Sequence, residues 1–157
     1  MNIRTNVVLS FFVAVIIAGV LGSILQTQIN LAYLRDIGPP VSFAMRLSST
    51  WHDLVYFAPI YLAIIFATFI IAFPVAELVA NIFPGHRMVW LVVGAVSGLW
   101  SGFQLIDYIA PMPTFIAATR GVGGTLLLLL AAAVSALIYT LMTPALNSPA
   151  DNQDDPA

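Results

Sequence analysis

Four long apolar stretches without a charged residue constrain this chain more than any other feature. They cover residues 7–25, 55–76, 88–106 and 121–142. A helix rises about 1.5 Å per residue, so about 20 apolar residues cross a hydrocarbon core about 30 Å thick. Each stretch therefore predicts one membrane-spanning helix. Together they predict an all-α integral membrane protein, a bundle of four transmembrane helices with both ends of the chain on one side of the membrane.

Composition supports this class and removes others. Hydrophobic residues make up 61% of the 157 residues and charged residues only 8%, far below the roughly 25% of soluble domains. The chain has no lysine and a net charge of -2, so it offers no basic surface for nucleic acid. It has no cysteine, which excludes disulfides, thiolate metal ligands and thiol nucleophiles. We therefore expect membrane lipids, and no nucleic acid, among its partners.

The loops set the expected boundaries of the spans. Gly38–Pro40 interrupts any helix in the long first loop, and residues 41–49 fit a short helix in the headgroup region. Thr50 and Asp53 have the spacing of a capping box, which would start the second span at residue 54. The fourth span would contain Arg120. We expect one transmembrane domain over residues 1–146, with spans at about 7–28, 54–83, 88–109 and 115–143, and a disordered acidic tail over residues 147–157.

Arginines give the only signal for orientation. Arg4 and Arg87 lie on one side of the predicted bundle, and Arg35, Arg46 and Arg120 lie on the other, so the charge bias nearly cancels. The apolar run of the first stretch exceeds the 7 to 15 residues of a secretory signal core, which predicts a retained anchor. Its short lead favours both termini in the cytoplasm.

Small residues at four-residue spacing mark the surfaces through which the spans are expected to pack. In the third span Gly94, Gly98 and Gly102 follow this spacing, which lets two helix backbones approach closely in lipid. The neighbouring face carries Ser97, Ser101, Gln104 and Tyr108, and the opposite face, which we expect to contact lipid, carries Val92, Val96, Leu99, Phe103 and Ile106. The glycine row can hold the four helices of one chain together, or it can serve a homodimer or another docked protein.

Polar residues gather at one end of the predicted bundle, where the first and third loops meet. These candidate site residues are Gln26, Gln28, Asn30, His52, Asp53, Gln104, Asp107 and Arg120. Within the cluster we expect Asp107 and Arg120 to form an ion pair. The pair would either brace two helix ends or line a recess for a lipid headgroup, an anion or a loop of a partner.

The other end of the bundle is less polar. Glu77 can reach Arg87 only if the turn between the second and third spans folds back, and Arg4 is an equally suitable partner for Glu77. His52 and His86 flank opposite ends of the second span, about 45 Å apart along the helix, so they cannot share a metal or a haem. We predict no catalytic residue, no metal site and no cofactor.

Three stretches give the chain a family resemblance. Residues 23–31, 53–59 and 115–121 are similar to segments of uncharacterised small four-helix inner-membrane proteins of bacteria, and the resemblance extends over most of the chain. It implies a bacterial inner membrane, and it carries no function. We expect a structural or accessory subunit that docks a membrane partner. The alternatives are a carrier or channel for a small solute and, less favoured, an enzyme that acts on lipid at the membrane surface.

Overall fold

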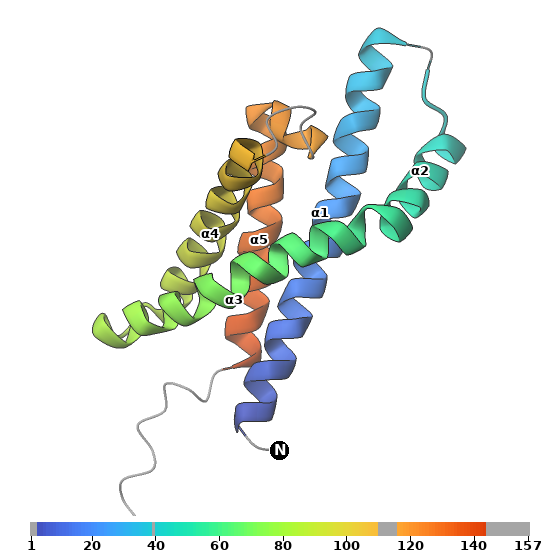
Figure 1. Cartoon of the computed structure of the whole chain (residues 1–157). Coiled ribbons are helices and arrows are strands. Elements are labelled where there is room, and N and C mark those ends of the chain that lie inside the picture. The colour runs from blue at the N-terminus through green and yellow to red at the C-terminus, as the bar shows by residue number, and fades with distance from the viewer. Residues whose placement is uncertain (1–2, 39, 110–115, 144–157) are drawn as a thin grey trace, which may run out of the picture.

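A computed structural model describes residues 3–38, 40–109 and 116–143, and within these ranges all regular structure is helical (Figure 1). The elements are α1 (Ile3–Ile37), α2 (Phe43–Tyr56), α3 (Ala58–Ile82), α4 (Arg87–Ile109), the short 3-10 helix η1 (Ala117–Arg120) and α5 (Val122–Met142). Helices α1, α3, α4 and α5 are each long and apolar enough to cross a membrane. The predicted all-α, multi-pass membrane fold is confirmed. The tail over residues 147–157 lies outside the described residues.

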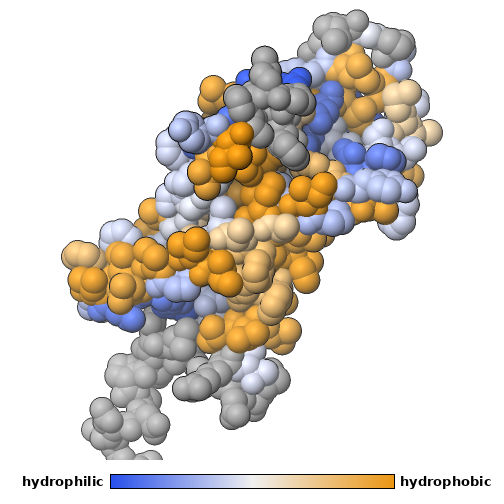
Figure 2. Space-filling view, viewed as in Figure 1, coloured by the Kyte–Doolittle hydropathy of each residue, from blue (hydrophilic) through white to orange (hydrophobic). Residues whose placement is uncertain are grey.

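The four long helices enclose one apolar core. Helix α3 packs on α4, α4 on α5, α5 on α1, and α1 on α3, which closes a ring. Bulky side chains fill its centre, among them Tyr61, Phe69, Leu99 and Leu128, none more than 1% exposed. Figure 2 shows a hydrophobic surface across the middle of the molecule and hydrophilic residues toward its ends. The start of α1 and the end of α5 lie at the same end (Figure 1).

The first loop is shorter than predicted because helices occupy most of it. Helix α1 has 35 residues, and α2 has 14. The capping box predicted at Thr50 and Asp53 is wrong: both residues lie inside α2, whose N-cap is Ser42 with its hydroxyl accepting from the Met45 amide. The same spacing occurs within a helix, where it places both side chains on one face. The second span begins instead at Ala58, next to Pro59.

The lipid-facing surface predicted for the third span is wrong at two positions of α4. Leu99 and Phe103, expected to contact lipid, are buried at 0% and 2% exposure. The glycine row packs on α3: a Cβ added at Gly98 would lie 2.7 Å from the Cβ of Ala72. Helix α4 contacts both α3 and α5, so two of its faces are covered. Large side chains of α4 fill the centre between the four helices. The glycines lie on the side of α4 that contacts α3, where their lack of a side chain lets the two helices approach closely.

The fourth span also begins later than predicted. Arg120 ends η1, and an extended Gly121 with φ -119° and ψ 141° separates it from α5. The chain can fold back here because Gly124 has no side chain: a Cβ at Gly124 would overlap the carbonyl oxygen of Ala118. Arg120 therefore lies beside the start of α5 and not within it.

Candidate functional site

At the polar end, α2 is held against α1 by its hydrophilic face. Thr27 donates its hydroxyl proton to the Asp53 carboxylate at 2.7 Å. Gln28 contacts two other residues of α2. Its side-chain nitrogen donates to the Thr50 hydroxyl at 3.0 Å, and its side-chain oxygen accepts from the Arg46 guanidinium at 2.8 Å. Of the candidate residues, Gln28 and Asp53 therefore take part in one interhelical network. Thr27, Arg46 and Thr50 complete this network, although the sequence did not mark them as site residues.

The opposite face of α2 is apolar and exposed. It carries Phe43, Leu47, Trp51 and Val55, and none of the residues of α2 is buried. An amphipathic helix of this kind lies in the membrane interface with its apolar face toward the acyl chains. Here the polar face is turned toward α1 and the apolar face is free for lipid. The structure confirms a short helix that includes residues 43–49, and its placement at the membrane surface stays a prediction.

We expect Thr27→Val to loosen α2 without unfolding the four spans. The substitution keeps the shape of the side chain and removes the hydroxyl that the Asp53 carboxylate accepts from. A hydrogen bond to a charged group contributes about 1.5–3 kcal/mol, so amide exchange within α2 should rise by at least about tenfold. Hydrogen-exchange mass spectrometry in detergent measures this, with Thr5→Val, at an exposed residue of α1, as the control. Equal amide exchange within α2 in the two variants would contradict the idea that the Thr27–Asp53 hydrogen bond holds α2 against α1.

Three further candidate residues occupy different surroundings. Gln26 points into the bundle, 5% exposed, and its side-chain oxygen has no hydrogen-bond partner among the described residues. His52 is exposed, with its ring 4.5 Å from that of Tyr56 and its Nδ1 3.6 Å from an Asp53 carboxylate oxygen. Asn30 lies farther along α1. These residues do not form one compact site.

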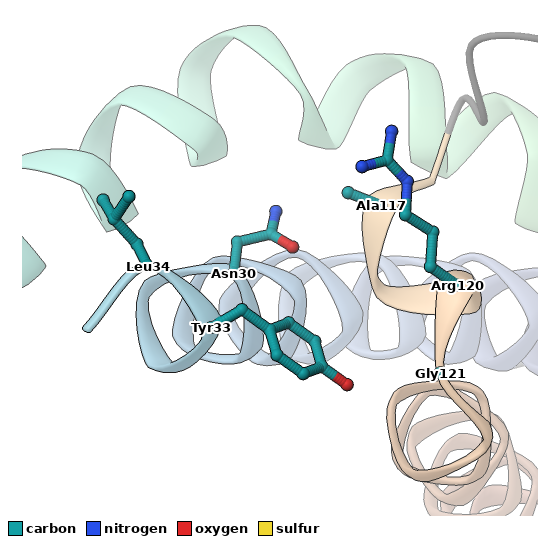
Figure 3. A pocket seen from close by; sticks show the side chains of 6 residues that line it. All are labelled: Asn30, Tyr33, Leu34, Ala117, Arg120 and Gly121. Atoms are coloured by element: carbon teal, nitrogen blue, oxygen red, sulfur yellow. The ribbon is translucent and has the colours of Figure 1, made fainter. Parts of the chain in front are cut away.

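Asn30 and Arg120 line the same surface recess between α1 and η1, shown in Figure 3. The recess has a volume of about 530 Å³. Tyr33, Leu34, Ala117 and Gly121 also line it, among the residues that the structure describes. In Figure 3 the amide of Asn30 and the guanidinium of Arg120 extend to the same side of α1, and the ring of Tyr33 extends toward Gly121. A Cβ added at Gly121 would lie 2.6 Å from the Tyr33 hydroxyl, so the two segments are in close contact.

Gln104 and Asp107 stand apart from the other candidates. Gln104 is exposed on α4 and Asp107 is half-buried near its end. In the part of the chain that the structure describes, neither one bonds to another candidate residue, and Asp107 forms no ion pair with Arg120. The expected ion pair of Asp107 with Arg120 is therefore wrong, and Arg120 instead lines the recess together with Asn30.

The strongest polar cluster lies at the opposite end of the bundle. Arg87 is only 6% exposed, and its Nε donates to the Glu77 carboxylate at 2.8 Å. Its two terminal nitrogens donate to the carbonyl and the hydroxyl of Thr143, each at 2.9 Å. Its guanidinium also lies 5.9 Å from the centre of the Tyr139 ring. The turn at Gly85, with φ +95°, brings Arg87 back toward Glu77, so this cluster joins α3, α4 and the end of α5.

A long groove runs along the outside of the bundle between α3 and α4. Its volume is about 650 Å³, and small residues such as Ala72, Ala76 and Gly98 form its floor. Ser97 and Ser101, both exposed, line the α4 side. The Ser97 hydroxyl donates to the Val93 carbonyl at 2.6 Å, within its own helix. Ser101 and the nearby Gln104 have no hydrogen-bond partner among the described residues.

Comparison with known protein families, curated proteins and solved structures finds no match for this chain. Among the residues that the structure describes, no group of three histidine or acidic side chains is placed to hold a metal ion. Four features of the described residues can bear a function: the interhelical network, the recess, the buried ion-pair cluster and the groove.

Proposed function

We propose that the protein is an accessory membrane subunit that docks a transmembrane helix of a partner protein in the groove between α3 and α4. One observation carries the proposal: polar side chains of α4 project outward at a depth where only lipid surrounds a solitary bundle. Ser101 lies three residues from the midpoint of α4, about 4.5 Å along the axis, and Gln104 about 9 Å. The hydrocarbon core extends about 15 Å to either side of the membrane midplane.

A hydroxyl or amide in hydrocarbon is stabilised by a hydrogen-bond partner, which acyl chains cannot provide. Ser97 meets this need within α4, through the Val93 carbonyl. Ser101 and Gln104 do not, since no described residue bonds to them. A transmembrane helix in the groove would supply a partner for Ser101, which lines it, and could reach Gln104, three residues farther along α4. The small residues of the groove, such as Ala72 and Ala76, would let its backbone approach closely. Polar contacts and close packing of this kind drive helix association in membranes.

The shape of the surface favours a helix of a different chain over a second copy. Two copies related by a two-fold axis place the same patch against itself, so a groove would face a groove. A single helix fills a groove between two others, as ridges fill grooves in helix packing. Gly94 and Gly98 already pack on α3, so they cannot also form the flat, self-complementary face of a glycine-zipper dimer.

The first test replaces Ser101 and Gln104 by leucine. Both side chains are exposed, so the double variant should fold as well as the wild type. The groove loses the hydroxyl of Ser101 and gains bulk, and the adjacent surface of α4 loses the Gln104 amide. Two interhelical hydrogen bonds of about 0.6–1.7 kcal/mol each predict that the partner is retained about eightfold less tightly, or weaker still, in mild detergent. The control is Leu126→Ala with Leu130→Ala, on the exposed outer face of α5.

Photo-crosslinking identifies the occupant of the groove. A photoreactive residue at position 101 should yield an adduct with another membrane protein at fixed stoichiometry, whereas one at position 126 should not. A monodisperse protein without adducts from either position would contradict the proposal. An adduct with a second copy of this chain would replace the accessory role by a homodimer.

The other functions considered from the sequence have weaker support. A carrier or channel needs a path through the bundle, but Tyr61, Phe69 and Leu99 fill its centre. An enzyme acting at the surface would rely on His52, whose side chain is 66% exposed and whose neighbours are Asp53 and Tyr56. Docking accounts for the exposed Ser101 and Gln104 side chains of α4.

We further propose that the protein resides in a bacterial inner membrane with both termini in the cytoplasm. The resemblance of residues 23–31, 53–59 and 115–121 to small inner-membrane proteins supports the location. An even number of spans supports a common side for the two termini. Reporter fusions active only in the cytoplasm should be active at both ends of the chain. Activity of a periplasmic reporter at either end would contradict the orientation.

A further inference from the structure

We infer that the bundle binds an ordered water molecule in its interior, between α1 and α3, where the water joins Ser23, Gln26 and Tyr61. These side chains carry three buried oxygen atoms to which no described residue hydrogen-bonds: the hydroxyls of Ser23 and Tyr61 and the side-chain carbonyl of Gln26. The three residues are 0%, 5% and 1% exposed. The inference is independent of helix docking, since this cluster lies in the core and the groove lies on the outside of the bundle.

One turn of α1 brings the three side chains together. A Cβ added at Gly22 would lie 2.8 Å from the Tyr61 hydroxyl oxygen, so this hydroxyl occupies the place of a side chain at position 22. Ser23 is the next residue, and Gln26 is the neighbour of both on the helix surface, four residues after Gly22 and three after Ser23. Side chains of a helix lean toward its N-terminus, so we expect the Gln26 amide to extend over Gly22 and Ser23.

One water molecule satisfies all three groups. The Gln26 carbonyl oxygen only accepts hydrogen bonds, whereas the hydroxyls of Ser23 and Tyr61 can each donate one. A water donates to Gln26 and accepts from the two hydroxyls, which gives the about three hydrogen bonds that a buried water typically makes. Buried polar groups without a partner destabilise a fold, so binding of water at this place is favoured.

The surroundings suit water better than an ion or a lipid group. All three side chains are neutral, and none of them supplies the charge that would compensate a buried ion. The rings of Phe57 and Phe103 stack on that of Tyr61, with centres 5.5 Å and 6.5 Å away. Tyr61 is only 1% exposed, so its hydroxyl is closed to the lipid around the bundle. A ligand of this cluster must therefore be small and uncharged.

Water can reach the cluster from the polar end of the bundle. Tyr61 lies nine residues from the midpoint of α3, about 13.5 Å along the axis, close to the edge of the hydrocarbon core. The hydroxyl of Thr27, the residue after Gln26, lies 3.0 Å from the Ser23 carbonyl oxygen and 2.7 Å from an Asp53 carboxylate oxygen. The Asp53 side chain is 29% exposed, so the cluster adjoins a partly hydrated network.

The sign of the stability change in Tyr61→Phe tests the site. The substitution keeps the ring and its stacking and removes the hydroxyl. With water bound, the variant loses a hydrogen bond, and its folding equilibrium constant in mixed micelles should fall about fivefold. A hydroxyl without any partner would give the opposite result, because its removal relieves a penalty. An unchanged or larger folding constant in Tyr61→Phe would therefore overturn the inference.

Ser23→Ala tests whether the two hydroxyls share one water. Combined with Tyr61→Phe, the fall in the folding constant should be smaller than the product of the two single effects, because both variants lose bonds to the same molecule. The control is Ser10→Ala: this buried hydroxyl donates to the Asn6 carbonyl at 2.7 Å, and it lies 13 residues, about 20 Å, before Ser23 on α1. Its effect should multiply with that of Tyr61→Phe. Multiplication in both pairs would contradict a shared water.

Radiolytic labelling with X-rays detects the water itself, because hydroxyl radicals form at bound water and modify the side chains beside it. Tyr61 should be modified faster than Phe69, which is 0% exposed in the centre of the bundle, and Ser23→Ala should slow the modification of Tyr61. Equally slow labelling of Tyr61 and Phe69 would overturn the inference even if Tyr61→Phe is destabilised. Direct hydrogen bonds among the three side chains would then explain the loss of stability.

Discussion

Arg87→Gln should lower the free energy of unfolding by about 3 kcal/mol or more. The substitution leaves the Glu77 carboxylate, whose side chain is 23% exposed, without its counter-ion, and it frees the carbonyl and hydroxyl of Thr143. Removing one partner of a buried ion pair costs about 3–5 kcal/mol because the remaining charge stays desolvated. Three helices are joined at this point, so the whole bundle should unfold at lower denaturant. Reversible unfolding in mixed micelles with increasing dodecyl sulfate measures the change.

Two further variants separate the buried pair from a simple loss of charge. Arg46→Gln removes a half-buried arginine that donates one hydrogen bond to Gln28, so it should cost about 1.5 kcal/mol, less than Arg87→Gln. Glu77→Gln combined with Arg87→Gln removes both charges and should be more stable than Arg87→Gln alone. Equal losses of stability in Arg87→Gln and Arg46→Gln would contradict the role of Arg87 in joining α3, α4 and the end of α5.

Gly124→Ala should destabilise the protein by about 1–3 kcal/mol, the cost of overpacking a close contact. The added methyl group would overlap the carbonyl oxygen of Ala118 and lie 3.0 Å from its carbonyl carbon. These are backbone atoms, so η1 must move away from α5 to make room.

The adjacent glycine offers a matched control. A Cβ added at Gly123 meets nothing within 4 Å, so Gly123→Ala introduces no clash. Alanine has a higher helix propensity than glycine, and Gly123→Ala should be neutral or more stable by up to about 1 kcal/mol. The same unfolding assay compares the two variants. Equal stability of Gly123→Ala and Gly124→Ala would contradict the close packing of η1 on α5.

The sequence predicts which polar residues gather at this end of the bundle, but it does not predict which of them bond to one another. Topology alone places Gln28, Asp53 and Arg120 at one end of the bundle, since the intervening spans fix their sides. It does not determine that Gln28 bonds to Thr50 and Arg46, or that Arg120 shares a recess with Asn30. These contacts depend on α1 continuing to Ile37 and on the break at Gly121.

The sequence by itself determined the number of spans and which parts of the chain leave the membrane. This information is local, because each segment must satisfy its own backbone and expose apolar side chains over about 30 Å. The tertiary structure alone decided which face of each span is buried. Leu99 and Gly98 are both compatible with lipid and with a helix contact, so hydropathy cannot rank them. It also decided that Arg87 meets Thr143, 56 positions later, since only packing brings the ends of α4 and α5 together.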